Sequence, residues 1–368
     1  MQIKYFNFLK LSFIAFISLG LHACSGDDEA VEYTADFTYE IDGENPNLVH
    51  FTNTSKGDYL YLQWDYGKDA GLGAKESDKT SVRSINYPLK GSYEVTLLVW
   101  GSTNNSSDTK TITQTIEIAQ DDPDYSGGNL IWSDEFEGSA VNQGNWTFEE
   151  GTGDNGWGNQ ELQYYTKGDN VSVANGMLSI TAKKVNDNKA QGSYTSTRMI
   201  SWGKQEFTYG RIEVRAKLPS GKGVWPAIWM LGANLNSVGW PACGEIDIME
   251  YVGYQPNVVH GTVHTTSGSG GNGNGGSKTL ETAEEAFHIY GLLWKEDALT
   301  FYIDSPENVV HTYAPVVKND SNWPFNKPHF FILNMAVGGT WGGAQGIDNS
   351  IFPQTMEIDY VRVYELDN

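Results

Sequence analysis

The sequence of 368 residues predicts an all-β protein with two folded regions, and three observations support this fold class. Segments in which apolar and polar residues alternate recur along most of the chain, as expected for half-buried strands. Gly, Asn, Asp and Pro separate these segments and indicate turns. Amphipathic helical patterns are scarce, the best lying at residues 281–286, and the aromatic content of 13% suits pleated sheets.

Residues 1–24 are expected to be an export signal and not part of a fold. Lys4 and Lys10 precede an apolar run at 11–19 that is too short to cross a bilayer. The run ends in Leu21-His-Ala-Cys24, which resembles a bacterial lipobox and makes Cys24 the expected lipidation site. We therefore expect an outer-membrane lipoprotein, tethered by acyl chains at the cell surface or the periplasmic face. The acidic residues that follow predict a linker at 25–31.

The formal net charge of −22 restricts the class of partner. Nucleic acid is bound largely through Lys and Arg on phosphates, so this chain should not bind it. Anionic polymers should be repelled as well, whereas a neutral polysaccharide is an acceptable partner. The cysteines are Cys24 and Cys243, which provide no disulfide framework, and Cys243 is expected to be buried as a small apolar residue. We expect a monomer.

The first folded region is predicted at residues 32–120. Its short alternating segments, spaced by turn residues, indicate a small β-sandwich. Three pieces resemble an Ig-like PKD module: FTNTS at 51–55, WDYG at 64–67 and YPLKGSYEVTL at 87–97. No cluster of chemically reactive residues occurs here, so a spacer is the expected role, with glycan binding as the alternative.

A charged stretch with Pro and Gly at residues 121–128 predicts a linker to the second region. Strand patterns resume after it and continue to the C-terminus. Because they extend over more than 200 residues with few helical patterns, they predict a second and larger β-sandwich at 129–368.

The segment EIDIME at residues 245–250 carries three carboxylates within a strand pattern. Side chains alternate between the two faces of a strand, so Glu245 and Asp247 share one face. Glu250 lies five residues from Glu245 and would point to the opposite face. One β-bulge at Ile248–Met249 restores it to the first face, because a bulge inserts one extra residue, and bulges are frequent beside active sites.

Three carboxylates on one face repel one another, which function explains more readily than structure does. A retaining glycosidase needs two carboxyl groups about 5–5.5 Å apart, one as nucleophile and one as proton donor. Asp247, lying between Glu245 and Glu250, could hold a shared proton and keep the pKa of the acid raised. A solvated strand face and a metal site are the alternatives for this segment taken by itself.

Motifs on both sides of this segment favour the catalytic role over a solvated strand face or a metal site. They are WSDEF at 132–136, GWGNQELQYYT at 156–166, YGRIEVRAKLPSGKGVWPAIWML at 209–231, HGTVH at 260–264, LNMAVGGTW at 333–341 and FPQTMEIDYVRVY at 352–364. In this order, and together with EIDIME, they resemble the laminarinase-like branch of glycoside hydrolase family 16 over all of residues 129–366.

The resemblance implies a concanavalin A-like β-jelly-roll of two curved sheets with a cleft on the concave face. It implies retaining, endo-acting hydrolysis of β-1,3-glucan without a catalytic cofactor. Glu245 matches the family's nucleophile, Asp247 its assisting aspartate and Glu250 its general acid/base.

The resemblance also implies a set of sugar-binding residues in the cleft: Asn159, Arg198, Trp225, Trp229, His264 and Trp341. Core packing is the alternative for Trp225 and Trp229, whereas Trp341 is expected to close one end of the cleft. His260 and His264 lie four residues apart on a predicted strand, roughly 13 Å at about 3.3 Å per residue, and so cannot share one metal ion.

A structural calcium ion often occurs on the convex side in this family. The implied ligands are Glu137, the carbonyl of Gly176 and Asp359, an oxygen set that suits calcium. The Gly-rich segment 268–277 is predicted to be a flexible loop near His264.

Two other functions stay open at this point. One is hydrolysis of mixed-linkage β-1,3-1,4-glucan or of an algal galactan by the same kind of site. The other is a non-catalytic, glycan-binding surface protein on the same sandwich fold, since a fold does not fix a function. A binding protein of that kind would be expected to lack Glu245 or Glu250, and both are present.

Overall fold

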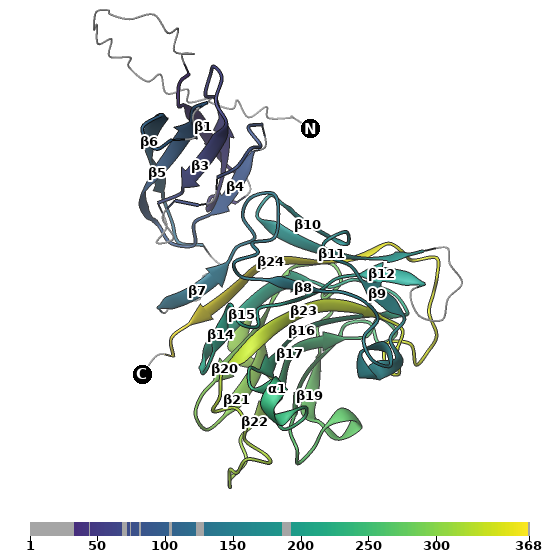
Figure 1. Cartoon of the computed structure of the whole chain (residues 1–368). Coiled ribbons are helices and arrows are strands. Elements are labelled where there is room, and N and C mark those ends of the chain that lie inside the picture. The colour runs from purple at the N-terminus through teal and green to yellow at the C-terminus, as the bar shows by residue number, and fades with distance from the viewer. Residues whose placement is uncertain are drawn as a thin grey trace, which may run out of the picture.

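The computed structural model describes residues 33–366, apart from residues 44, 68–71, 74, 81, 103–104, 123–128 and 186–192 (Figure 1). The expected export signal with Cys24 and the expected linker at 25–31 lie outside the described residues, as does most of the expected linker at 121–128. Within the part that the structure describes, no helix is both long enough and apolar enough to cross a membrane.

The N-terminal region contains two three-stranded antiparallel sheets. One has the order β1 (Phe37–Ile41), β2 (Leu48–Asn53) and β4 (Arg83–Asn86), and the other has the order β3 (Tyr61–Asp65), β5 (Gly91–Trp100) and β6 (Thr109–Ile118). Side chains from both sheets share one core, in which Phe37 meets Trp64 edge to face at 5.2 Å. This pairing of sheets follows from the alternation of buried and exposed residues along each strand.

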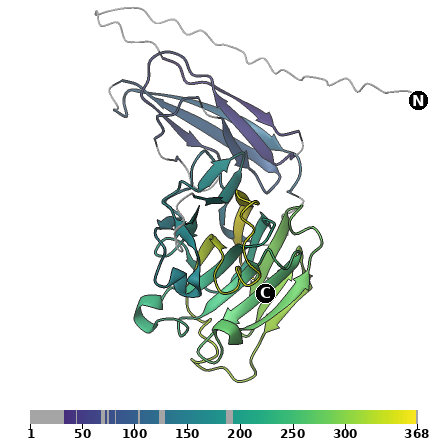
Figure 2. The same cartoon turned by 90° about the vertical axis from the view of Figure 1, so that its right-hand side faces the viewer.

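The rest of the chain forms a β-jelly-roll of two larger sheets packed face to face (Figure 2). The ten-stranded sheet has the order β22 (Ser305–Tyr313), β21 (Leu299–Ile303), β20 (His288–Trp294), β15 (Gly210–Lys217), β24 (Gln354–Tyr364), β11 (Met177–Lys184), β12 (Tyr194–Ser196) and β9 (Gln163–Tyr165), with β10 (Val171–Ala174) beside β11 and β7 (Leu130–Asp134) beside β24. The eight-stranded sheet has the order β19 (Asn274–Thr279), β18 (Val258–His264), β17 (Glu245–Tyr251), β16 (Val224–Gly232), β23 (His329–Val337), β13 (Arg198–Ile200) and β8 (Thr147–Glu149), with β14 (Glu206–Phe207) beside β23.

Helices are short and few in the described chain, which confirms the all-β prediction. They are η1 (Gly156–Gln160), α1 (Leu235–Val238) and η2 (Gly270–Asn272). The segment with the best helical pattern, residues 281–286, forms turns, with Ala286 N donating to Thr282 O at 2.9 Å.

The Gly-rich segment at 268–277 differs from its prediction as a loop. Residues 274–277 belong to β19, the edge strand that pairs with β18, and residues 270–272 form η2. Glycine permits this close pairing, since a Cβ at Gly275 would lie 2.6 Å from Thr262 Oγ1 and 2.7 Å from Gly261 O. Composition indicated flexibility, but the backbone of β18 offers these residues hydrogen-bond partners.

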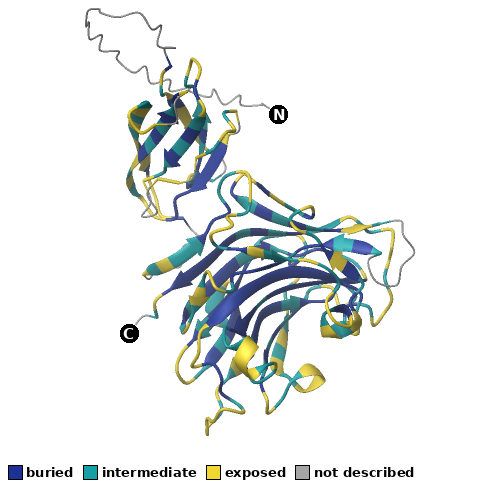
Figure 3. Cartoon of the chain, in the orientation of Figure 1, coloured by how far each residue is buried: buried dark blue, intermediate teal, exposed yellow. Residues whose placement is uncertain are grey.

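The core between the two large sheets decides which side chains face outward. On β18, Val259 and Val263 are buried in that core, and a Cβ at Gly261 would meet the ring of Phe301 at 3.0 Å. The residues between them, His260 and Thr262, therefore point to the other face of the eight-stranded sheet. Figure 3 shows the buried residues running along the strands of both sheets.

Arg362, on β24, links the two regions of the chain. Its guanidinium is buried, donates two hydrogen bonds of 3.0 Å to Glu135 and contacts Asp122 at 3.1 Å. Asn86, at the end of β4 in the N-terminal region, accepts with its amide oxygen from Arg362 Nη2 at 3.1 Å and donates with its amide nitrogen to Asn47 O at 3.0 Å. A buried ionic cluster thus lies where the two regions meet.

Candidate active site

A bulge on β17 places the three carboxylates of EIDIME. Asp247 pairs with Thr262 and Glu250 pairs with His260, so Ile248 and Met249 together oppose the single residue Gly261. The neighbouring strand β16 shows the same irregularity between Ile228 and Trp229. The bulge predicted at Ile248–Met249 is confirmed, and it returns Glu250 to the face that carries Glu245 and Asp247.

Burial and mutual repulsion act on the ionisation of these groups. Burial, with the nearby charge of Asp247, raises the pKa of Glu245 well above its usual range. Burial also raises the pKa of Asp247 well above its usual range, and the charge of Glu250 adds to this rise. The pKa of Glu250 is raised by burial and held back by a hydrogen bond from Trp225. The site therefore favours retaining protons on its carboxyl groups.

Two indoles hold the outer carboxylates in place. Trp225 Nε1 donates to Glu250 Oε1 at 3.0 Å, and Trp240 Nε1 donates to Glu245 Oε2 at 2.8 Å. Trp225 is 9% exposed, whereas Trp240 is 49% exposed. Each carboxylate keeps a second oxygen for chemistry, because only one oxygen of each receives an indole N–H.

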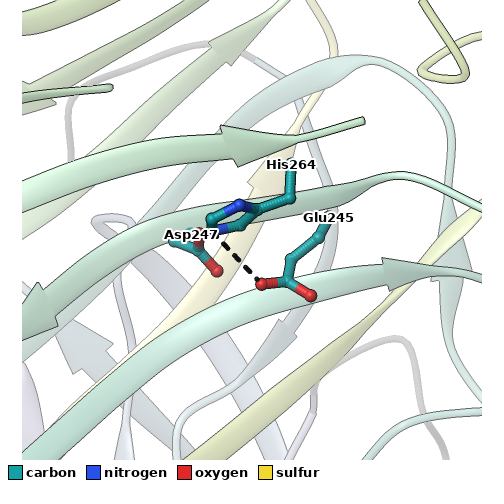
Figure 4. Close-up of side chains that lie close together, drawn as sticks. All are labelled: Glu245, Asp247 and His264. Carbon is teal, nitrogen blue, oxygen red and sulfur yellow. Dashed lines mark ion pairs between the residues drawn. The ribbon is translucent and has the colours of Figure 1, made fainter. Parts of the chain in front are cut away.

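His264, on β18, lies opposite Glu245 in the strand pairing and close to Asp247 (Figure 4). Its Nε2 lies 3.1 Å from Asp247 Oδ2 and 3.6 Å from Glu245 Oε1. Oδ2 of Asp247 is buried and has no hydrogen-bond partner of good geometry. A charge on His264 lowers the pKa of both Glu245 and Glu250.

Glu245, Asp247 and His264 also form a group that could hold a cation. Their ligand atoms lie within 4.8 Å of one another, and among the described residues this is the one group of three or more such side chains. A cation here would use the carboxylate of Glu245 and would therefore compete with any chemistry of that residue. His260 is not part of this group, in agreement with the strand spacing.

Trp229 and Arg198 lie together on the same sheet, on β16 and β13. The guanidinium of Arg198 sits over the ring of Trp229 at 4.8 Å and over that of Trp157 at 4.6 Å, and its Nε donates to Glu149. Trp229 is half-buried and donates from Nε1 to Asn334 Oδ1 at 2.7 Å. The strand pairing of β13, β16 and β23 brings these residues together from distant parts of the sequence.

Asn159 and Trp341 approach the site from two loops. Asn159, in η1, is partly buried and donates from Nδ2 to Glu161 Oε1 at 3.1 Å. Trp341 packs edge to face on Trp225, with ring centroids 5.4 Å apart, and its ring centroid lies 5.0 Å from that of His260. A cavity of about 270 Å³ next to His260 is lined by the small residues of β19.

The sequence did not single out several residues of this site, namely Trp157, Glu161, Trp240 and Asn334. A local signal existed for two of them. Glu161 is the only acidic residue of the motif GWGNQELQYYT. Trp240 precedes EIDIME by a few residues. Asn334 lies in the motif LNMAVGGTW, but the motif does not indicate its role, because its partners, Trp229 and the hydroxyl of Tyr165, are far away in sequence.

The expected calcium ligands lie along the border with the N-terminal region. A Cβ at Gly176 would lie 3.2 Å from Leu48, and the charge of Glu137 raises the pKa of Tyr87. Asp359 accepts a hydrogen bond of 2.7 Å from Arg215 Nη1, and burial raises its pKa to about 6. Asp359 thus already has a cationic partner and fits a metal ion only if Arg215 moves away.

Comparisons with known proteins agree with this geometry. The family described as Glycosyl hydrolases family 16 matches residues 158–362. The chain is 44% identical to a β-glucanase of Rhodothermus marinus over 247 residues, which cover 64% of this chain and 84% of that protein. It is 33% identical to glucan endo-1,3-β-glucosidase A1 of Niallia circulans over an alignment of 394 residues, covering 95% of this chain and 57% of that protein. The crystal structure of a laminarinase from Flavobacterium sp. UMI-01 superimposes with a TM-score of 0.60 at 48% identity, covering 64% of this chain and all of that one.

Proposed function

The chain belongs to glycosyl hydrolase family 16, and we infer from its site that it hydrolyses β-1,3-glucan at internal linkages through Glu245 and Glu250. The observation that carries this proposal is the bulge at Ile248–Met249, which puts Glu245, Asp247 and Glu250 on one face. A retaining glycosidase requires two carboxyl groups beside the scissile bond, and here each of the two carboxylates is also held by one indole. Hydrolysis of this kind needs no cofactor.

In the first step Glu250 would protonate the leaving oxygen while a Glu245 oxygen attacks the anomeric carbon. The glycosidic bond breaks, and a covalent glycosyl-enzyme forms. In the second step Glu250 would accept a proton from water, which attacks the same carbon and releases Glu245. The raised pKa of Glu250 supports the first role, since the acid must carry a proton near neutral pH.

Asp247 and His264 would stabilise the negative charge that moves between carboxylates during these two steps. Asp247 is buried 3.1 Å from His264 Nε2 and can share a proton with Glu245. When Glu245 is consumed as an ester, its negative charge disappears, and Asp247 can then ionise beside His264 at lower cost. One carboxylate near His264, either Glu245 or Asp247, can therefore carry the negative charge at each step of the reaction.

The sugar chain would lie across the faces of Trp225, Trp229 and Trp341, with polar contacts from Asn159 and Arg198. An indole face suits the apolar face of a sugar ring, and its N–H remains bonded to the protein. Trp229 and Arg198 lie on one side of β17, and the cavity beside His260 lies on the other. Sugar units on both sides of the carboxylates favour cleavage within a chain.

Product analysis tests this function. On laminarin we expect oligosaccharides of several lengths from the start, and NMR of the first products should show the β-anomer, as retention requires. Lichenan and a galactan serve as comparison substrates, because mixed-linkage or galactan hydrolysis would give faster release from one of them. No reducing sugar from any polysaccharide would instead favour a glycan-binding protein.

We further propose that residues 32–120 are a PKD-like spacer, and that Cys24 carries the lipid that tethers the protein to the outer membrane. The buried cluster around Arg362 supports a fixed spacer, because it joins the N-terminal region to β24. Labelling with a radioactive fatty acid, with Cys24→Ser as control, tests the anchor.

A structural calcium ion at Glu137, Gly176 O and Asp359 is a separate proposal. It would displace Arg215 from Asp359, take no part in hydrolysis and stabilise the fold. Thermal unfolding with and without calcium and a chelator, together with the metal content of the purified protein, tests it.

A further inference from the structure

Glu161 is a buried carboxylate that the proposed reaction does not use. It lies between η1 and β9, and it is 6% exposed. Three neutral side chains donate to it: Asn159 Nδ2 to Oε1 at 3.1 Å, Gln163 Nε2 to Oε2 at 2.7 Å and Tyr165 OH to Oε2 at 3.3 Å. Such a set of donors suits an ionised carboxylate, which can only accept hydrogen bonds.

The hydrogen bonds continue from Glu161 to an aromatic residue of the site. Tyr165 OH accepts from Asn334 Nδ2 at 3.0 Å, and Asn334 Oδ1 accepts from Trp229 Nε1 at 2.7 Å. The four groups form one chain with consistent donors and acceptors, in which Glu161 is the terminal acceptor. Its charge therefore sets the direction of every bond out to Trp229.

The backbone around Glu161 is joined to the segment that leads to Trp341. Leu162 N donates to Val337 O at 2.9 Å, and Thr340 N donates to Asn159 O at 2.7 Å. Gly339, with φ of +75°, packs against both Glu161 and Trp225, because a Cβ built on it would be 3.3 Å from both Glu161 Cγ and Trp225 Cζ3. Glu161 thus shares this glycine with Trp225, the residue whose indole donates to Glu250.

We propose that Glu161 is a positioning residue of the active site, which holds Asn159, Trp229 and the 338–341 segment in place and puts a fixed charge close to Trp225, the partner of Glu250. The inference rests on the proposed role of Glu250 as acid/base. It assigns Glu161 no contact with the reacting atoms.

The charged neighbours agree with this arrangement. The pKa of Glu161 is raised by burial and lowered by its donors and by the Arg198 guanidinium. The pKa of Glu250 is raised in part by the charge of Glu161, against the lowering effects of Trp225 and His264. Asp247 and Glu245 also face Glu250 from its own strand. A negative charge at Glu161 should therefore help Glu250 to retain its proton.

The first test is Glu161→Gln, which removes the charge and keeps the shape. The alkaline limb of the pH profile of kcat/KM on laminarin, which reports the acid of the free enzyme, should move to lower pH by roughly half a unit. KM should rise, because a glutamine amide cannot accept from all three donors. Glu206→Gln, an exposed carboxylate on β14 that accepts from Gly203 N, is the matched control and should change neither quantity.

The second test is Glu161→Asp, which keeps the charge and shortens its reach by one methylene. The limb should stay near its wild-type position, while KM rises several-fold because Asn159 loses its partner. An unmoved limb in Glu161→Gln, or an equal shift in both variants, would overturn the proposal. If Glu161→Gln does not fold, the KM of Glu161→Asp is the deciding measurement. A wild-type KM of Glu161→Asp would then refute the positioning role.

The two proposals fail in different ways. If Glu250→Gln keeps wild-type activity, the proposed function fails, whatever Glu161 does. If Glu250→Gln is inactive and Glu161→Gln has the wild-type profile, only the positioning role of Glu161 fails.

Discussion

Trp225 Nε1 donates a hydrogen bond to Glu250 Oε1 over 3.0 Å. The bond stabilises the ionised carboxylate and so lowers the pKa of Glu250, against the larger effect of burial. It also fixes one oxygen of Glu250 and leaves the other free. The indole that would stack on a sugar thus also tunes and orients the group that would protonate the leaving oxygen.

Replacing Trp225 with Phe should therefore shift the pH dependence as well as weaken binding. Without the hydrogen bond the pKa of Glu250 rises, and the alkaline limb of kcat/KM moves to higher pH. Trp229→Phe is the matched control, because that indole donates to Asn334 and to no carboxylate. It should raise KM with an unmoved alkaline limb, and equal limb shifts in both variants would contradict the assignment.

Glu245→Gln and Glu250→Gln should each lose nearly all hydrolysis of laminarin while remaining folded by circular dichroism. Their behaviour should separate on an aryl β-glucoside whose phenol is a good leaving group, since such a group needs no proton. Glu250→Gln should still release the phenol in the first turnover, although on laminarin it loses roughly 10²–10⁴-fold in kcat. Glu245→Gln should release none, and wild-type activity of either variant on laminarin would refute its role.

His264→Gln should move both limbs of the pH profile upward. A charge on His264 lowers the pKa of Glu245 and of Glu250, so its loss raises both. Glu245 must be ionised to attack, so activity is lost at the acid side; Glu250 must be protonated, so activity persists further to the alkaline side. His260→Gln, on the same face of β18, should leave both limbs in place.

Arg362→Met should destabilise the whole chain. It leaves the buried carboxylates of Glu135 and Asp122 without their cation, which costs about 3–5 kcal/mol in the free energy of unfolding. Arg215→Met removes a partly exposed pair with Asp359 and should cost at most about 1 kcal/mol. Urea unfolding of both variants measures the difference, and similar losses would contradict the burial argument.

The sequence could predict the strand face of the catalytic segment because that face depends on local periodicity. Side chains alternate along a strand, so Glu250 could share the face of Glu245 and Asp247 only if EIDIME contained one extra residue. The register of β17 against β18 contains that residue at Ile248–Met249. Local composition gave a wrong prediction where hydrogen-bond partners outside the segment decide its structure. Residues 274–277, of which two are glycines, form an edge strand because β18 offers them hydrogen bonds.

By itself, then, the sequence determined the all-β class, the family motifs and the common face of Glu245, Asp247 and Glu250. Only the tertiary structure decided which groups control those carboxylates. Trp225, Trp240, His264 and Glu161 come from separate strands and loops, and their distances to the site depend on strand order and loop path. Periodicity places a side chain on a face, whereas a hydrogen bond across strands requires two backbones in one register, which the packing of the complete sheets fixes.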